Sequence, residues 1–195
     1  VRAIESGERD FSKILGLTWR APDGTVVKNP DRPPIMDLDS LPLPDWSLVD
    51  LDWYGVNTFP PSWGKQVLLT LSRGCPYHCQ FCLPRLASYN TYREHGTKRK
   101  LEIISELYHK YERRMFWIND LIFGVNEERT REFLEGLINE GLKINMCVDM
   151  RVDLLLRRKH LLPLMREAGV RIVALGIESP LPKDNEAYNK YPSGM

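Results

Sequence analysis

The sequence predicts an α/β fold in which parallel strands alternate with helices. The segment KQVLLTLS, residues 65–72, is a near-continuous apolar run typical of a strand buried on both faces. Three further strand patterns follow at residues 114–120, 143–150 and 170–177. Helical patterns separate them, and Gly141 and Gly169 are placed to end two of these helices. Such alternation indicates right-handed crossovers, in either an open doubly wound sheet or part of a barrel.

The region before the first of these strands has a different sequence pattern, with a hairpin signal followed by a proline-rich stretch. From about residue 14, ILGLTWR and TVVKN flank the turn signal APDG and predict a β-hairpin. Five prolines then fall between residues 30 and 44, which favours an extended connector lying on a surface. Its expected anchors are apolar: Ile35, Leu38, Leu41, Leu43 and Trp46.

The three helices are expected from apolar residues recurring at helical spacing. The residues are Leu101, Ile104, Leu107, Tyr108 and Tyr111 in the first, Phe133, Leu134, Leu137 and Ile138 in the second, and Leu161, Leu162, Leu164 and Met165 in the third. The sequence stops soon after the fourth strand, and an incomplete barrel leaves unpaired strand edges. We therefore expect the chain to be a piece of a longer protein.

Composition excludes some classes of function. Of 195 residues, 43% are apolar and 27% charged, and the net charge is +1, so nothing points to nucleic acid or an acidic membrane. No apolar run approaches the about 18–20 residues that span a bilayer, and no signal-peptide core is present, so we expect a cytoplasmic protein. The basic runs at 93–100 and 157–159 are interpreted as solvated helix ends.

Three of the four cysteines lie within eight positions, Cys75, Cys79 and Cys82, in the spacing C-x3-C-x2-C. Clustered thiols in a reducing compartment favour a metal site, either an iron–sulfur cluster or zinc. Zinc would have to recruit Cys75 and His78 or Cys147 besides the C-x2-C pair. Cys147 is instead interpreted as a small buried strand residue.

The position of the cysteines favours a catalytic metal site over a purely structural one. They follow the first strand, and loops at the carboxyl ends of parallel strands form active sites. Pro76 and Gly74 favour a loop wrapped around the group. A cubane cluster takes one ligand per iron, so three cysteines leave one iron open for another molecule.

These residues resemble the radical S-adenosylmethionine (SAM) superfamily: C-x3-C-x2-C after a first strand, with Phe81 before the last cysteine. The segments DLDSLPLPDWSLVDLDWY, LTLSRGCPYHCQFC, WINDLIF and LLPLMREAGVRIVALGIES resemble its cobalamin-binding-domain branch, which includes the anaerobic magnesium-protoporphyrin IX monomethyl ester cyclases. The resemblance implies a partial (β/α)6 barrel, a [4Fe–4S] cluster on the three cysteines, and SAM on the fourth iron, cleaved to a 5′-deoxyadenosyl radical. Cobalamin is implied by resemblance alone, because its histidine motif is not in these residues.

The resemblance also assigns cofactor-binding residues: Phe81 near the adenine, Asp120 near the SAM amino group, Arg151 at its carboxylate, and Glu178 and Ser179 at ribose hydroxyls or the ammonium. Relatives often have two acidic residues where this chain has Asn119 and Asp120, which puts Asn119 in doubt. Asp120 could instead cap a helix and Arg151 could make a surface salt bridge. Asp149 and Asp153 could orient Arg151.

The domains expected are the edge of an upstream cobalamin-binding-like domain at 1–29, a proline-rich linker at 30–64, and the first four strand–helix units of a truncated barrel at 65–195. The expected function is reductive SAM cleavage to start C–H radical chemistry on a small molecule, with a tetrapyrrole cyclisation first and a radical C-methyltransferase next. A flavodoxin or ferredoxin would supply electrons. The competing class is a zinc-stabilised, non-catalytic binding module; a tRNA methylthiotransferase lacks support, because no basic RNA face is evident.

Overall fold

The computed structural model describes residues 2–53, 61–83 and 91–190, which form two compact units, residues 1–36 and 37–195. The first unit holds helix α1 (Arg2–Glu5) and the antiparallel strands β1 (Thr18–Arg20) and β2 (Val26–Lys28). The predicted hairpin is thus confirmed. Asn29, only 4% exposed, closes it by donating its amide to the carbonyls of Phe11 and Ile14 and accepting the indole N–H of Trp19.

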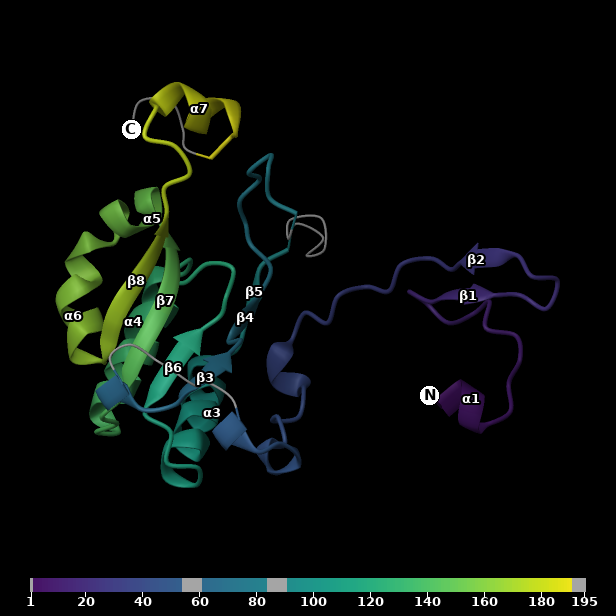
Figure 1. The fold of residues 1–195 in the computed structure, drawn as a ribbon, viewed down its shortest axis with the longest axis horizontal. Coiled ribbons are helices and arrows are strands. Elements are labelled where there is room, and N and C mark those ends of the chain that lie inside the picture. The colour runs from purple at the N-terminus through teal and green to yellow at the C-terminus, as the bar shows by residue number, and fades with distance from the viewer. Residues whose placement is uncertain (1, 54–60, 84–90, 191–195) are drawn as a thin grey trace. The chain divides into compact units, whose positions relative to one another are not determined.

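The second unit is built on a parallel sheet of four strands: β3 (Gln66–Leu69), β6 (Met115–Ile118), β7 (Asn145–Arg151) and β8 (Val170–Gly176). Each strand pairs with the next in the order β3-β6-β7-β8, all parallel, so the four predicted strands and their direction are confirmed. The order follows the chain without reversal, as Figure 1 shows. An open doubly wound sheet reverses its order at a switch point. The sequential order therefore favours the barrel, which stays a prediction.

Helices α3 (Thr97–His109), α4 (Glu127–Asn139) and α6 (Leu162–Glu167) connect these strands. Alternate strand residues pack against the helices, among them Val67, Phe116 and Met146, each at most 4% exposed. On the opposite face the register aligns Leu68, Trp117, Cys147 and Ile172 in one row, of which Leu68 is 60% exposed. The helices therefore cover one face of the sheet, and α3, α4 and α6 succeed one another along it (Figure 1).

A short antiparallel ribbon follows β3. Strand β4 (Ser72–Arg73) pairs with β5 (Arg93–Glu94), just before α3. The interpretation of residues 93–100 as a solvated helix end is wrong here, because Lys100 is only 6% exposed and its ammonium lies 2.5 Å from the Glu94 carboxylate. Composition alone could not show that the run crosses from a strand into a buried helix face.

The proline-rich connector is not uniformly extended. It contains the 3-10 turns Leu38–Ser40, Trp46–Leu48 and Leu51–Trp53, with another at Pro61–Trp63. Asp37 and Asp45 cap the first two by accepting backbone amides two residues on. Leu38 is 1% exposed, and Leu43 and Trp46 pack against the core, whereas Ile35 is 46% exposed.

Helices α5 and α7, like the short α1, were not predicted as separate elements. Helix α5 (Val152–Arg157) begins directly after β7, and a 3-10 turn (Lys159–Leu161) joins it to α6. Helix α7 (Pro182–Ala187) follows β8. No helix among the described residues is long and apolar enough to cross a membrane.

Candidate functional site

The loop that carries the three cysteines, residues 74–83 and called the cysteine loop below, starts from a fixed point. The Asp120 carboxylate follows β6 and accepts the backbone amides of Leu71 and Ser72 at 2.7 and 2.9 Å. Asp120 does not cap a helix, since Asn126 caps α4. Gly74 has φ +86, a conformation that suits glycine, and it turns the chain into the loop.

The cysteine loop borders a cavity of about 540 Å³ at the carboxyl ends of β6, β7 and β8. Seven of the eight residues predicted to bind metal or cofactor line it: Cys75, Cys79, Phe81, Cys82, Asp120, Arg151 and Glu178. Asn119 and Asp149 line it as well. Residues that the sequence analysis assigned to one site, up to about a hundred positions apart in the chain, therefore share one cavity.

The donor set is chemically suited to an iron–sulfur cluster, because thiolates are ligands that iron–sulfur clusters prefer. Burial raises the pKa of the Cys75 thiol, and the nearby Cys79 and Cys82 sulfurs add to the rise. Each thiolate of such a set binds a different iron of a cubane. The three thiols line one cavity and could supply one sulfur to each of three irons.

The other cysteine and the loop histidine do not join this set. Cys147 is 2% exposed in the middle of β7, where burial raises the pKa of its thiol, as expected for a buried strand residue. His78 is exposed, and its carbonyl accepts the side-chain amide of Asn189 at 3.2 Å.

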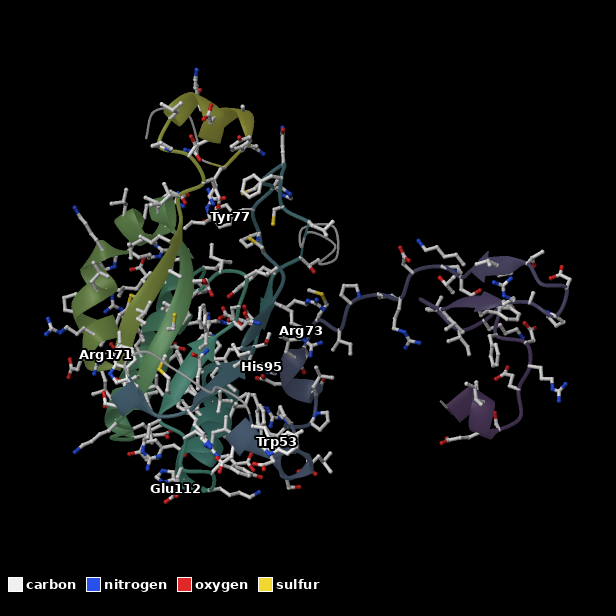
Figure 2. The ribbon with its side chains drawn as sticks, viewed as in Figure 1. Trp53, Arg73, Tyr77, His95, Glu112 and Arg171 are labelled. Carbon is white, nitrogen blue, oxygen red and sulfur yellow. The ribbon has the colours of Figure 1, made fainter. Side chains whose placement is uncertain are left out.

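Arg151, the last residue of β7, is buried at 7% exposure, so its ion pair with Asp153 is a buried one and not the surface salt bridge expected as an alternative. Its guanidinium pairs with the Asp153 carboxylate at 2.8 Å and donates to the Cys79 sulfur at 3.1 Å. Burial opposes the charge, but the hydrogen bond that Arg151 donates to Asp153 and the negative charge of Asp153, together with smaller contributions from its other neighbours, outweigh it and raise the pKa of Arg151. Tyr77, labelled in Figure 2, stacks on the guanidinium, with its ring centroid 3.9 Å from Arg151 Cζ. Asp153 therefore orients Arg151, as one alternative predicted.

Asp149 has a different partner. Its Oδ2 accepts the indole N–H of Trp117 at 2.9 Å, across the β6–β7 pair. This bond fixes an acidic side chain at the cavity wall. That Asp149 orients Arg151 stays a prediction.

The segment after β8 folds back onto the cysteine loop. Glu178 has φ +64, unusual for a residue other than glycine, and its carboxylate pairs with the Lys190 ammonium at 2.5 Å. Lys190 is 6% exposed and lies 5.5 Å from the Phe81 ring, which also meets Tyr188 edge-on at 5.6 Å. The Gln80 amide donates to the Tyr188 carbonyl at 2.9 Å.

Ser179 is the one predicted residue that the structure does not bring to the cavity. Its hydroxyl donates to Asp184 at 2.7 Å and accepts the Leu181 amide, so it organises the start of α7. Lys190 and Tyr77 are the residues that sequence reasoning missed. Tyr77 could have been noticed as an aromatic residue between two ligand cysteines, but Lys190 gives no local signal, because only folding brings it to the loop.

Curated proteins with related sequences include a cyclase and a methyltransferase. The chain is 31% identical over 192 residues to an anaerobic magnesium-protoporphyrin IX monomethyl ester cyclase of Rubrivivax gelatinosus, covering 97% of this chain and 34% of the cyclase. It is 32% identical over 190 residues to an uncharacterized methyltransferase of Pyrococcus horikoshii, covering 97% of this chain and 39% of that protein. No family model matches. The chain thus spans about a third of the length of these curated relatives.

Solved structures share the fold. The cobalamin-dependent SAM radical enzyme OxsB, with aqua-cobalamin and SAM bound, superposes with a TM-score of 0.78 at 18% identity, covering 97% of this chain and 28% of OxsB. The radical SAM methyltransferase TsrM of Kitasatospora setae, with cobalamin and a [4Fe–4S] cluster bound, gives 0.66 at 15% identity, covering 100% of this chain and 38% of TsrM. Together with the sequence matches, these likenesses confirm that the chain resembles the cobalamin-binding branch of the radical SAM enzymes.

Proposed function

We propose that this chain is the cofactor-binding part of a radical SAM enzyme. Cys75, Cys79 and Cys82 hold a [4Fe–4S] cluster through three irons and leave the fourth iron for SAM. The observation that supports this most is the placement of all three thiols on one cavity at the carboxyl edge of a parallel sheet, beside cationic, acidic and aromatic side chains. When bound, the cluster and SAM supply radical chemistry through one-electron cleavage of the sulfonium.

The chain's own residues bind and orient. Asp120 fixes the start of the cysteine loop, while Phe81, half exposed at the cavity, offers a ring face for an adenine. Glu178 presents a carboxylate that accepts hydrogen bonds from hydroxyls or an ammonium. Arg151 is kept charged by Asp153 next to the cluster ligands. The roles of Phe81 and Glu178 follow the sequence assignment, whereas those of Asp120 and Arg151 differ from it; Ser179 acts through α7 instead.

The overall reaction rests on the relatives. Cyclase and methyltransferase relatives match this chain equally well, at 31% and 32% identity, so we propose a cobalamin-dependent enzyme that performs either tetrapyrrole ring formation or C-methylation on a small molecule. The electron donor would be a flavodoxin or ferredoxin. The proposal includes a domain edge at residues 1–29, a linker at 30–64 and the first four strand–helix units of a barrel at 65–195. It also includes a cytoplasmic location.

Anaerobic reconstitution of the protein at its full natural length tests the cluster. With iron and sulfide, we expect about four irons per chain and a reduced-state EPR signal that changes when SAM is added. Cys79→Ala should lose the signal, whereas Cys147→Ala, a matched control at a buried strand cysteine, should keep it. A colourless protein with one zinc per chain, or a Cys79→Ala variant with intact iron content and signal, contradicts the proposal.

The products of SAM distinguish the two reactions. A methyl transfer leaves S-adenosylhomocysteine, whereas radical initiation leaves 5′-deoxyadenosine and methionine. A C-methyltransferase of this type should therefore form both nucleoside products during turnover. A cyclase without methyl transfer should form 5′-deoxyadenosine alone.

A further inference from the structure

We propose that Arg151 is a positioning residue on the cluster side of the cavity: it donates an N–H to the sulfur of Cys79 and thereby sets the reduction potential of the cluster. The inference rests on the proposed function, since it requires the cluster to be bound by Cys79. It replaces the SAM carboxylate as the group that Arg151 contacts.

The first support is the use of the guanidinium donors. Arg151 places Nε 2.8 Å from Asp153 Oδ1, and Nη2 3.3 Å from Asp153 Oδ2. Nη2 also donates to the carbonyl of Lys190, and Nη1 donates to Cys79 Sγ at 3.1 Å. A guanidinium binds a carboxylate in a bidentate manner through two parallel N–H groups, either those of Nε and Nη2 or those of Nη1 and Nη2. Asp153 takes the first pair, and Cys79 with Lys190 takes the second.

The second support is the way in which this arrangement is held. Asp153 is 2% exposed and also receives Nη2 of Arg157 at 3.0 Å. The same Arg157 nitrogen reaches the Tyr77 hydroxyl at 3.3 Å, and the Tyr77 ring supports the Arg151 guanidinium from one face. Residues from the cysteine loop, the end of β7 and helix α5 thus fix the N–H that points at Cys79. A side chain held on so many sides is pre-organised for one partner.

The third support is physical. Reduction adds negative charge to a cluster and its cysteine sulfurs, and a hydrogen bond to a sulfur stabilises the more negative state. Arg151 is buried, so water screens its charge only weakly. The N–H to Cys79 therefore raises the reduction potential and makes the cluster easier to reduce. Removing it should shift the potential in the negative direction.

The experiment is an anaerobic redox titration of the reconstituted full-length protein, followed by EPR, with iron content measured in parallel. In Arg151→Met, we expect about four irons per chain and a midpoint potential more negative than that of the wild type. The matched control is Arg158→Met, which removes an arginine paired with Glu127 away from the cavity. The control should keep the wild-type potential. An Arg151→Met variant with a loaded cluster and an unchanged potential overturns the inference.

A second variant keeps the test decisive if Arg151→Met does not fold. Arg151→Lys retains a positive charge but has no fork with which to hold Asp153 and Cys79 together. It should shift the potential in the same direction by a smaller amount, and a wild-type potential in this variant overturns the inference. The two levels of failure differ: a wild-type protein that takes up no iron refutes the proposed function, whereas loaded variants with unchanged potentials refute only the role of Arg151.

Discussion

The carboxylate of Asp120 accepts the backbone amide of Leu71, 49 positions earlier in the chain, at 2.7 Å. The same oxygen accepts the Ser72 amide at 2.9 Å, so one side chain after β6 fixes the chain just beyond β3. The cysteine loop begins two residues later. The position of the three cysteines therefore depends on a carboxylate that follows the neighbouring strand β6.

Removing this acceptor should destabilise the protein. Asp120→Ala removes the acceptor of two buried amides, and each amide left unsatisfied costs about 1–3 kcal/mol of unfolding free energy. Asp120→Asn retains a carbonyl oxygen that can accept both amides, so it should cost less. Urea denaturation at neutral pH measures both. Equal stabilities of the alanine and asparagine variants would show that the two bonds contribute nothing.

Asp120 should also make stability depend on pH. Burial raises the pKa of its carboxyl above the ordinary value of 3.8, so the folded protein holds the proton to higher pH than the unfolded chain does. The resulting stabilisation is complete below pH 3.8 and is lost as the pH rises through the folded-state pKa. Wild type should therefore lose stability relative to Asp120→Asn across this window. A constant difference between the two proteins from acid to neutral pH contradicts this.

The ion pair between Lys100 and Glu94 should be costly to break on one side only. Both side chains are 8% exposed, and removing the Lys100 charge leaves the buried Glu94 carboxylate with only the more distant pairing to Arg129, at 3.8 Å, among the described residues. Lys100→Met should lower the unfolding free energy by about 3–5 kcal/mol. The control is Lys98→Met, two positions earlier in α3, where the side chain is 91% exposed. This variant should change the unfolding free energy by less than about 0.5 kcal/mol. Thermal or urea unfolding of the two variants compares them directly.

Two glycines that end helices should respond differently to alanine. At Gly169, φ is +104, and a Cβ would lie 2.4 Å from the carbonyl oxygen of Ile144. At Gly141, φ is +67, and nothing lies within 4 Å of the corresponding position. Gly141→Ala should cost about 1–2 kcal/mol from the left-handed backbone alone. Gly169→Ala should cost clearly more, and similar unfolding midpoints for the two variants would contradict the clash.

Glu178 should contribute to SAM binding. Its carboxylate is held at the end of β8 on the cavity and is one-third exposed. A hydrogen bond to a charged group contributes about 1.5–3 kcal/mol, so Glu178→Gln should weaken SAM binding about 10–100-fold. Equilibrium dialysis against the oxidised, cluster-loaded protein measures the dissociation constant without turnover. Glu186→Gln, on the exposed side of α7, is the control and should bind SAM as the wild type does.

Much of the site could be predicted because its signals are local. The spacing of Cys75, Cys79 and Cys82 and their place after a strand appear in a few consecutive residues. The carboxyl ends of parallel strands meet at one edge, so residues that end β6, β7 and β8 were expected to converge, and Asp120, Arg151 and Glu178 do line one cavity. Ser179 is an exception. A side chain that follows a strand can point toward the next helix as easily as toward the cavity, and the Ser179 hydroxyl bonds Asp184 of α7.

The sequence by itself determined the alternation of strands and helices, the parallel sheet and the cysteine loop, because side-chain periodicity and cysteine spacing act over short stretches of chain. Only the tertiary structure decided that Arg151 faces the Cys79 sulfur, that Lys190 reaches back to Glu178, and that Lys100 is buried against Glu94. Each of these depends on where a charged side chain finds its partner once water is excluded. That choice is made by packing between distant segments, and no local pattern encodes it.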